Sequence, residues 1–345
     1  MDFIVSDFLK HKKITGSSST NNTISSYEND LNIFLNYLKK KNLSDFNKIT
    51  PKIIENFYVS KDFNTYIKFW KNKKNEERRK EKGLRSSSSK KRFIYTLSSF
   101  FKYLKFKKII DESPIQKLSN KELEDPQSLS TKEMNLILDY LDSDIFINNS
   151  KYPKRDKSII FILYYCGLRV SELINIKMSD IKFNNSNPYI IINGKGGKFR
   201  EQPCPCFKII LDYSKTDRLK ILNNRSSEYL FVSSYRKKNT LNKINSLTRQ
   251  FIDKIVKNIC NKAFENENFS IVKNIDKRKY KMISSHMFRH SIASHLLENG
   301  VDLVKVKEHL GHSSISITSR YLKSLIEKTK ILHDFGPLTG DISHD

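Results

Sequence analysis

Apolar residues recur with the spacing of an α-helix along the first hundred positions of the chain. The first stripe follows Thr23, which can cap a helix, and consists of Ile24, Tyr27, Leu31, Phe34, Leu35 and Leu38. A second helix is expected from Pro51 to Tyr58, because proline suits the first turn of a helix. A third begins after Arg85 and has an apolar side made of Phe93, Leu97, Phe100, Phe101 and Leu104. These stripes predict a small helical domain.

The second part of the chain mixes helical stripes with a short stretch of strand pattern. Ser130 and Glu133 have the spacing of a capping box, and Met134, Ile137, Leu138 and Leu141 follow on one face. Another apolar helix is expected from Ile159 to Cys166. The β-branched run 188–192, the glycine-rich turn 193–198 and the run 199–203 predict an antiparallel hairpin. A further helix is expected over 247–264. The fold class predicted is mainly α with a small β-sheet or hairpin.

Two breaks in these patterns divide the chain. Asp111-Glu112-Ser113-Pro114 ends the third helix, and the polar segment 120–128 is typical of a linker. We therefore expect a helical N-terminal domain over 1–119, a linker over 120–128 and a second domain over 129–333. A helix is expected to continue after Tyr321 as far as Ile331. Gly336-Pro337 breaks it, so residues 334–345 are expected to be a C-terminal tail.

Charge points to a polyanionic partner. The chain has 63 Lys and Arg against 37 Asp and Glu, a net charge of +26. Half of this excess lies in residues 61–110, which hold 17 basic and 4 acidic side chains. The charged run from Lys71 to Lys80 is expected to be a solvated helical connection. Nucleic acid is favoured over a membrane, because no long apolar span or amphipathic anchor is present.

Neither a leader sequence nor a metal site is predicted. Asp2, Asp7 and Lys10 interrupt any apolar N-terminal core, so we expect no secretory signal and a cytoplasmic, nucleoid-associated protein. The four cysteines are Cys166, Cys204, Cys206 and Cys260. Cys204-Pro205-Cys206 lacks the Cys-x-x-Cys spacing and no second pair completes a zinc site, so reduced thiols are expected.

The run from His286 to Leu322 carries the candidate chemistry. His286 and Arg289 lie three positions apart, so both side chains would face the same side of one helix. Gly311 can end a following short helix and present His312, and Tyr321 comes nine residues later. Arginine neutralises phosphate oxygens, histidine moves protons and tyrosine can attack phosphorus. This set of residues suits chemistry on a phosphodiester.

Here the chain resembles the tyrosine recombinase (phage integrase) family, most closely its Xer-like members that resolve chromosome dimers. The resemblance is carried by His286-Met287-Phe288-Arg289-His290, by Leu310-Gly311-His312-Ser313-Ser314 and by Tyr321. Upstream, Cys166-Gly167-Leu168-Arg169-Val170-Ser171-Glu172-Leu173 resembles the first arginine box of the family, and Gly194-Lys195-Gly196-Gly197-Lys198 its β-hairpin lysine. The resemblance implies a two-domain DNA clamp, with a helical core-binding domain before the tyrosine-recombinase catalytic domain.

The resemblance also implies a role for each residue of these boxes. The six catalytic residues would be Arg169, Lys195, His286, Arg289, His312 and Tyr321, with Tyr321 as the nucleophile. Glu172 lies three residues after Arg169, so by its position it can hydrogen-bond the guanidinium and orient it. Lys198 competes with Lys195 as the general acid within the same turn. The helix that opens with Ser86 to Arg92 would face DNA through Lys90, Lys91 and Arg92. No cofactor is expected, because bond energy is conserved without ATP or a metal.

The expected reaction is strand exchange through a 3′-phosphotyrosine and a Holliday junction, for dimer resolution or for integration and excision of a mobile element. The expected partner is double-stranded DNA with a short, imperfectly palindromic core site, bound by a homo- or hetero-tetramer on paired sites. A second recombinase or a DNA translocase could assist. Two alternatives stay open: a type IB topoisomerase, which would religate the same strand, and a catalytically idle DNA-binding protein.

Overall fold

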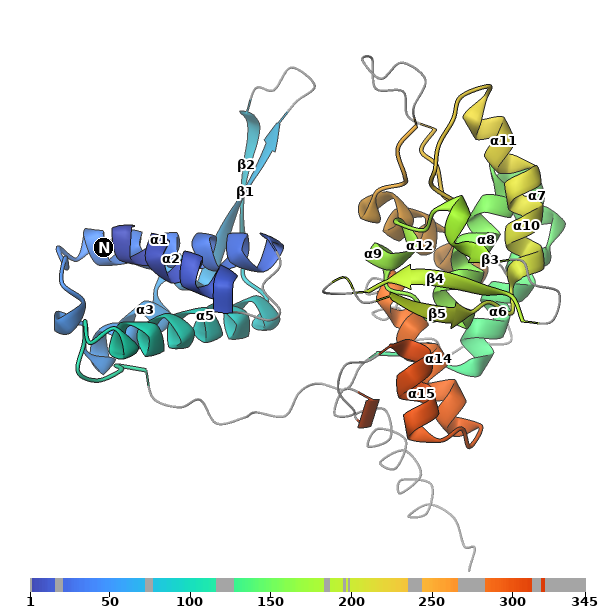
Figure 1. The fold of residues 1–345 in the computed structure, drawn as a ribbon. Coiled ribbons are helices and arrows are strands. Elements are labelled where there is room, and N and C mark those ends of the chain that lie inside the picture. The colour runs from blue at the N-terminus through green and yellow to red at the C-terminus, as the bar shows by residue number, and fades with distance from the viewer. Residues whose placement is uncertain are drawn as a thin grey trace, which may run out of the picture. The chain divides into compact units, whose positions relative to one another are not determined.

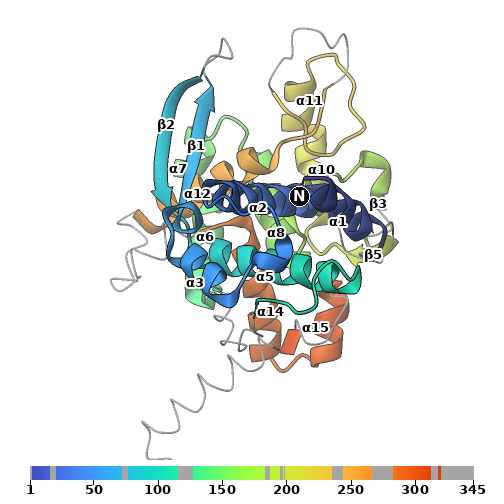
Figure 2. The ribbon, with the colours of Figure 1, turned by 90° about the vertical axis from the view of Figure 1, so that its left-hand side faces the viewer.

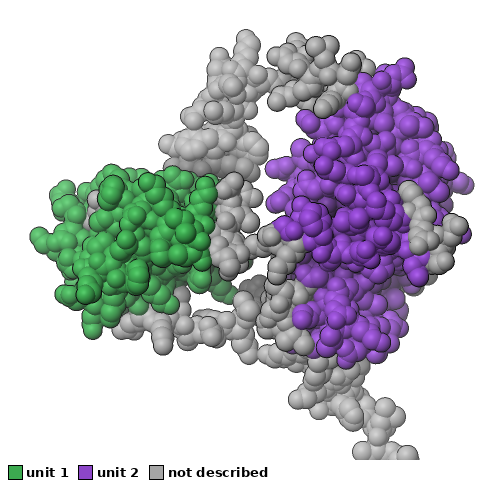
Figure 3. Space-filling model, in the orientation of Figure 1, with its two compact units in different colours: residues 1–122 green, residues 123–345 purple. Residues whose placement is uncertain are grey.

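The computed structural model describes residues 2–15, 21–71, 77–115, 127–182, 187–194, 197, 199–234, 244–265, 283–311 and 318–319. The chain divides into two compact units, residues 1–122 and 123–345 (Figures 1 and 3). Each unit has its own buried apolar cluster. As predicted, the protein is mainly helical, with small antiparallel sheets.

Unit 1 is a group of helices around an aromatic core. Its helices are α1 (Asp2–Thr15), α2 (Asn21–Lys40), the 3-10 turn η1 (Phe46–Lys48), α3 (Pro51–Val59), α4 (Lys61–Asn64) and α5 (Ser87–Phe106). The ring of Phe57 lies at the centre, with centroids 5.0 Å from Phe34, 5.4 Å from Phe63 and 5.5 Å from Phe93. These rings come from α2, α3, α4 and α5, so the stripes predicted from the sequence meet in one core.

Between α4 and α5 the expected helical connection is wrong. The chain instead forms strands β1 (Thr65–Lys71) and β2 (Glu77–Leu84), paired antiparallel with an irregularity between Trp70 and Lys71. Figures 1 and 2 show this hairpin extending from the helices of its unit. The physical reason lies in the composition of β1, where threonine, isoleucine and three aromatic residues favour a strand. The charged residues that follow masked that signal.

Unit 2 combines helices with a three-stranded sheet of order β3-β4-β5. Its strands are β3 (Ile181–Lys182), β4 (Tyr189–Asn193) and β5 (Phe199–Pro203). Its helices are α6 (Thr131–Asp142), α7 (Asp144–Asn149), α8 (Pro153–Tyr165), α9 (Val170–Leu173), η2 (Met178–Asp180), α10 (Phe207–Lys215), α11 (Asp217–Leu222), α12 (Arg249–Glu265), α14 (Ser285–Glu298) and α15 (Leu303–Leu310). The predicted capping box of Ser130 and Glu133 is present, and β4 pairs with β5 from Tyr189 opposite Pro203 to Asn193 opposite Phe199.

Helix α8 lies inside unit 2 and is apolar on most sides. Ile159, Ile160, Ile162 and Leu163 are all fully buried, against α10, α12 and α14. Because protein packs around this helix, its ends cannot shift easily, and the turn that follows Tyr165 is held in place. Within the described part of the chain, no helix is both long and apolar enough to cross a bilayer.

The first described residues of unit 2 are fastened to α14. The backbone N–H of Leu129 donates to Ser291 Oγ at 2.8 Å, and the Leu129 carbonyl lies 2.9 Å from His295 Nε2. His295 is buried, and its Nδ1 lies 2.8 Å from the hydroxyl of Tyr164 on α8. Both backbone groups of Leu129 are therefore satisfied inside the protein, at the point where the chain enters the unit.

We expect Ser291→Ala to lower the free energy of unfolding by about 1–3 kcal/mol, because it leaves the buried N–H of Leu129 without its acceptor. Denaturant unfolding of the full chain measures this change. Ser294→Ala, on the same helix at a half-buried position, is the matched control and should change stability little. Equal losses in the two variants would contradict this account of Leu129.

Candidate active site

Arg169 follows a tight turn at the end of α8. Cys166 ends the helix, and Gly167 adopts a left-handed conformation with φ of +57°. A Cβ atom on Gly167 would lie 2.7 Å from Leu310 Cδ2, so only glycine fits both the turn and its neighbour. The turn before Arg169 is thereby packed against the end of α15. Arg169 itself is the residue that precedes α9 and is partly exposed.

Glu172 makes two hydrogen bonds to Arg169, a contact that their three-residue spacing allowed. Its Oε2 accepts the backbone N–H of Arg169 at 2.8 Å and its Oε1 accepts Arg169 Nη1 at 3.0 Å. Burial of this carboxyl raises its pKa. The hydrogen bonds from Arg200 and from the Arg169 backbone, with the charges of both guanidinium groups, outweigh burial and leave the pKa of Glu172 below its ordinary value. Glu172 therefore stays ionised between two cations.

Arg200 was missed by the sequence analysis. It lies on β5 and makes a two-pronged contact with Glu172, Nη1 to Oε1 at 3.1 Å and Nη2 to Oε2 at 3.2 Å. Its Nε donates to Gln202 Oε1 at 3.3 Å, one strand period further on. The available signal was the alternation of β5, which places Arg200 and Gln202 on the same face.

Arg200 also lies against the turn that precedes His312. Gly311 ends α15 with φ of +62°, and a Cβ atom there would lie 2.7 Å from Arg200 Nε. Gln202 Nε2 lies 3.4 Å from Nδ1 of His309, whose Nε2 is 3.0 Å from the carbonyl of Tyr165. The return strand of the hairpin therefore contacts Glu172 of the first arginine box and the end of α15.

Arg289 is buried and links the turn after α8 to the end of α15. Only 1% of the residue is exposed, and its Nη1 and Nη2 donate to the carbonyl oxygens of Gly167 and Leu310, each at 2.5 Å. These bonds use two of the five N–H groups of the guanidinium. One buried cation thus fixes the backbone just before Arg169 and just before Gly311-His312.

His286 lies in the first turn of α14, at the protein surface. Asp253 on α12 holds the start of this helix, accepting from the backbone N–H of Ser285 at 3.3 Å and from its hydroxyl at 2.9 Å. Loss of hydration lowers the pKa of His286, and the charges of Arg289 and Arg169 lower it further. The imidazole is therefore neutral at pH 7 and can accept a proton.

Some of the predicted residues cannot be placed. Lys195, Lys198, His312, Tyr321 and the tail 334–345 lie outside the described residues. Their described neighbours are Gly194, Gly197 and Gly311, together with Thr318, which is buried. The structure therefore brings together Arg169, Glu172 and Arg289, places His286 within reach of the charges of both arginines, and adds Arg200 to the set.

Of the three predicted DNA contacts, Arg92 has a partner inside the protein. All three lie near the start of α5, which Ser86 caps by accepting from the N–H of Ser89. Arg92 Nη2 donates to Asp30 at 2.8 Å, and Thr96 also bonds that carboxyl. Burial is the main cause of a raised pKa for Asp30, which is 1% exposed. Arg92 thus links α2 to α5, whereas Lys90 is half-buried and Lys91 is exposed.

We expect Arg169→Gln to raise the pKa of His286, because the change removes one of the positive charges that disfavour its protonated form. An NMR titration of the His286 ring measures it. Arg225→Gln serves as the matched control, since Arg225 bonds the carbonyls of Leu222 and Ile221 and is not among the groups that shift His286. An unchanged His286 pKa in Arg169→Gln, or an equal rise in both variants, would contradict this electrostatic coupling.

Comparison with known proteins places this geometry in context. Residues 127–328 match the model of the phage integrase family. The tyrosine recombinase XerD of Staphylococcus epidermidis is 30% identical over 333 residues, which cover 95% of this chain and 97% of the relative. The XerD of Yersinia pestis is 29% identical over 316 residues, covering 90% of each chain.

Solved structures with the same fold are similar over nearly the whole chain. The XerH site-specific recombinase bound to its difH substrate, in a pre-cleavage complex, has a TM-score of 0.62 at 20% identity and covers 96% of this chain and 95% of its own. A lambda integrase dimer bound to a COC′ core site has a TM-score of 0.58 at 16% identity, covering 93% and 94%. The chain therefore belongs to the phage integrase family and is an Xer-like tyrosine recombinase, an enzyme of site-specific DNA recombination.

Proposed function

We propose that Tyr321 is the nucleophile of a DNA transesterification whose phosphate is held by Arg169, Arg289 and His312. The phenolic oxygen of Tyr321 forms a bond to phosphorus, the bond from phosphorus to the 5′ oxygen breaks, and a 3′-phosphotyrosine and a free 5′ hydroxyl result. The 5′ hydroxyl of a second duplex then attacks the phosphotyrosine and releases the tyrosine. The number of phosphodiester bonds is conserved, so no external energy source is required.

One observation carries this proposal: Arg289 fixes the turns on which Arg169 and His312 depend. Preorganised donors that need no rearrangement are effective at stabilising the charge that develops on a transferring phosphoryl group. Arg169 is fixed in the same way, by the two oxygens of Glu172. The supported role of this cluster is therefore to bind the nonbridging oxygens in a preset geometry.

Proton transfers complete the proposed reaction. His286 takes the proton of Tyr321, a role that suits an imidazole whose pKa is lowered below its ordinary value. Lys195, which lies between β4 and β5 in the sequence, gives a proton to the leaving 5′ oxygen, with Lys198 as the competing donor. Arg200 supports this assignment, because it ties β5, the strand that follows both lysines, to Glu172.

The proposed substrate is double-stranded DNA with a short, imperfectly palindromic core site, bound as a tetramer on paired sites. Support comes from the net charge of +26 and from the solved relatives, which are bound to difH and to a COC′ core site. Lys90, Lys91 and Arg92 at the start of α5 are the proposed contacts of unit 1 with the DNA backbone. The proposed role is resolution of chromosome or plasmid dimers in the cytoplasm, the role that the resemblance to Xer-like members implied, and relatives named tyrosine recombinase XerD support it. Integration or excision of a mobile element is the alternative.

Replacing Tyr321 tests the nucleophile and the target together. We expect cells that express the native chain to yield SDS-resistant protein–DNA adducts at one short palindromic site, and cells that express Tyr321→Phe to yield none. Sequencing of the attached DNA identifies the site. Tyr95→Phe, an exposed tyrosine on α5, is the matched control and should keep the adducts.

Each other outcome of that experiment contradicts part of the proposal. Adducts that persist in Tyr321→Phe would identify a different nucleophile. Adducts scattered without sequence preference, with relaxation of supercoiled DNA, would favour a type IB topoisomerase. An absence of adducts in the native chain under the same trapping would favour a DNA-binding protein without activity.

Arg200→Lys tests whether Arg200 positions the site. Lysine keeps the charge but loses the two-pronged contact with Glu172, so we expect the cleavage rate at saturating protein to fall roughly 10- to 100-fold. The affinity for uncut DNA should change less than threefold, which separates positioning from DNA binding. Arg225→Lys is the control. A cleavage rate equal to that of the native chain, at unchanged melting temperature, would show that Arg200 does not position the active site.

A further inference from the structure

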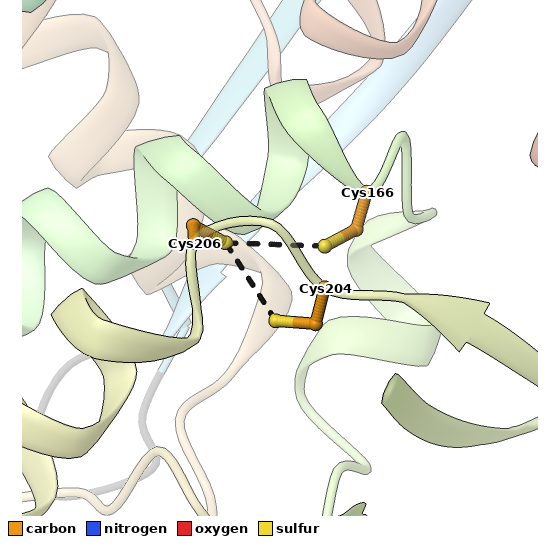
Figure 4. A group of neighbouring side chains, drawn as sticks. All are labelled: Cys166, Cys204 and Cys206. Carbon is orange, nitrogen blue, oxygen red and sulfur yellow. Dashed lines mark hydrogen bonds between the residues drawn. The ribbon is translucent and has the colours of Figure 1, made fainter. Parts of the chain in front are cut away.

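Three of the four cysteines converge inside unit 2. Cys166 ends α8, whereas Cys204 and Cys206 follow β5 and precede α10. Figure 4 shows the three side chains directed toward one another from these two segments. Cys206 Sγ lies 3.9 Å from Cys166 Sγ and 3.8 Å from Cys204 Sγ, and all three sulfurs lie within 4.8 Å of one another. The sequence predicted no metal site, because Cys204-Pro205-Cys206 lacks the Cys-x-x-Cys spacing and no second pair completes a zinc site; the approach of Cys166 to this pair is a tertiary contact.

The separations of the sulfurs match those of a three-coordinate metal centre. A metal–sulfur bond is about 2.3 Å, so three sulfurs in a plane around one ion lie about 4.0 Å apart. The separations of Cys206 Sγ from the other two sulfurs are within 0.2 Å of that value. A single ion would therefore fit between the thiols with little movement of the backbone.

The surroundings favour a soft ion of low coordination number. The three residues are between 0% and 5% exposed, so solvent cannot complete a larger coordination sphere. Among the described residues, no histidine, carboxylate or further cysteine joins the group. Thiolates select soft cations such as Cu(I), whereas a structural zinc site takes four ligands.

The thiols differ in how readily they lose their protons. Hydrogen bonds from the thiols of Cys166 and Cys206 lower the pKa of the Cys204 thiol, whereas the hydrogen bond with Cys204 and burial raise the pKa values of the Cys166 and Cys206 thiols. Cys204 is therefore the first thiolate ligand, and binding of an ion displaces the protons of the other two thiols.

We propose that Cys166, Cys204 and Cys206 form a binding site for one soft, thiophilic cation in three-coordinate geometry, with Cu(I) as the matching ion. The bound ion links the end of α8 to the end of β5. These are the segments that carry Arg169 and Arg200 to Glu172, so occupancy stabilises the framework of the active site without touching DNA. The inference rests on the cysteines alone and is independent of the roles assigned to Tyr321, Lys195 and His312.

Titration of the reduced full-length protein with Cu(I), without oxygen and in competition with bathocuproine disulfonate, tests the site. We expect one tightly held Cu(I) per chain, a higher melting temperature on binding, and X-ray absorption from three sulfurs at about 2.3 Å. Alanine at Cys166, Cys204 or Cys206 should lower the affinity at least roughly 100-fold, since even loss of a residue supporting a ligand costs 10- to 100-fold.

Cys260→Ala is the matched control, because Cys260 is an equally buried thiol on α12 outside the cluster, and it should keep full affinity. Far-ultraviolet circular dichroism without metal separates lost binding from lost folding, and Cys→Ser at the same positions supplies a second set of variants. Absence of stoichiometric binding by the folded native chain would overturn the proposal. So would binding that survives in a folded Cys206→Ala chain, or a zinc complex tighter than the Cu(I) complex.

Discussion

The active-site half of the chain depends on hydrogen bonds that Arg289 donates to the backbone of two turns. A guanidinium that is 1% exposed would be costly to bury alone, and the carbonyls of Gly167 and Leu310 satisfy it. The converse also holds, since the Leu310 carbonyl ends α15 and the Gly167 carbonyl lies just after α8, where the helix supplies neither with a donor. Each glycine turn is thus stabilised by a residue more than twenty positions away. Arg289 is as much a structural link as a candidate for phosphate binding, and its loss would disturb both boxes at once.

Glu172 likewise links two elements, because it accepts hydrogen bonds from two arginines. Arg169 reaches it from the turn after α8, and Arg200 reaches it from β5. Because Glu172 is buried, removing one cation would leave its charge only partly compensated. The carboxylate therefore fixes the position of β5 relative to the turn that carries Arg169. Gly311 packs against Arg200 on another side.

The sequence predicted the local features of this site well. Periodicity located α2, α5 and α6, and the glycine-rich turn predicted the pairing of β4 with β5. The Arg169–Glu172 contact also followed from spacing alone, because residues three positions apart meet within one helical turn.

What could not be predicted arises from tertiary contacts. Arg200 is one of 63 basic residues in the chain, and the pairing of β4 with β5, which the sequence predicted, does not reveal that β5 meets Glu172 of α9. The meeting of Cys166 with Cys204 and Cys206 has the same origin, since α8 and β5 are about forty positions apart in sequence. The β1–β2 hairpin was missed for another reason: its charged residues carried no alternation that would distinguish a strand from a solvated helix.

The lowered pKa values of two histidines near the site are what a site built to bind a phosphate would show before the phosphate arrives. Loss of hydration lowers the pKa of both His286 and His309, and the nearby arginines lower it further: Arg289 and Arg169 act on His286, and Arg289 and Arg200 act on His309. The folded state thus disfavours protonated histidine, so these two groups lower stability as the pH falls through the ordinary histidine range and raise it as the pH rises. A phosphate diester among the arginines would bring the missing negative charge and raise both pKa values. Its arrival would therefore turn His286 from a weak base into a stronger one at the moment when the nucleophile must lose its proton.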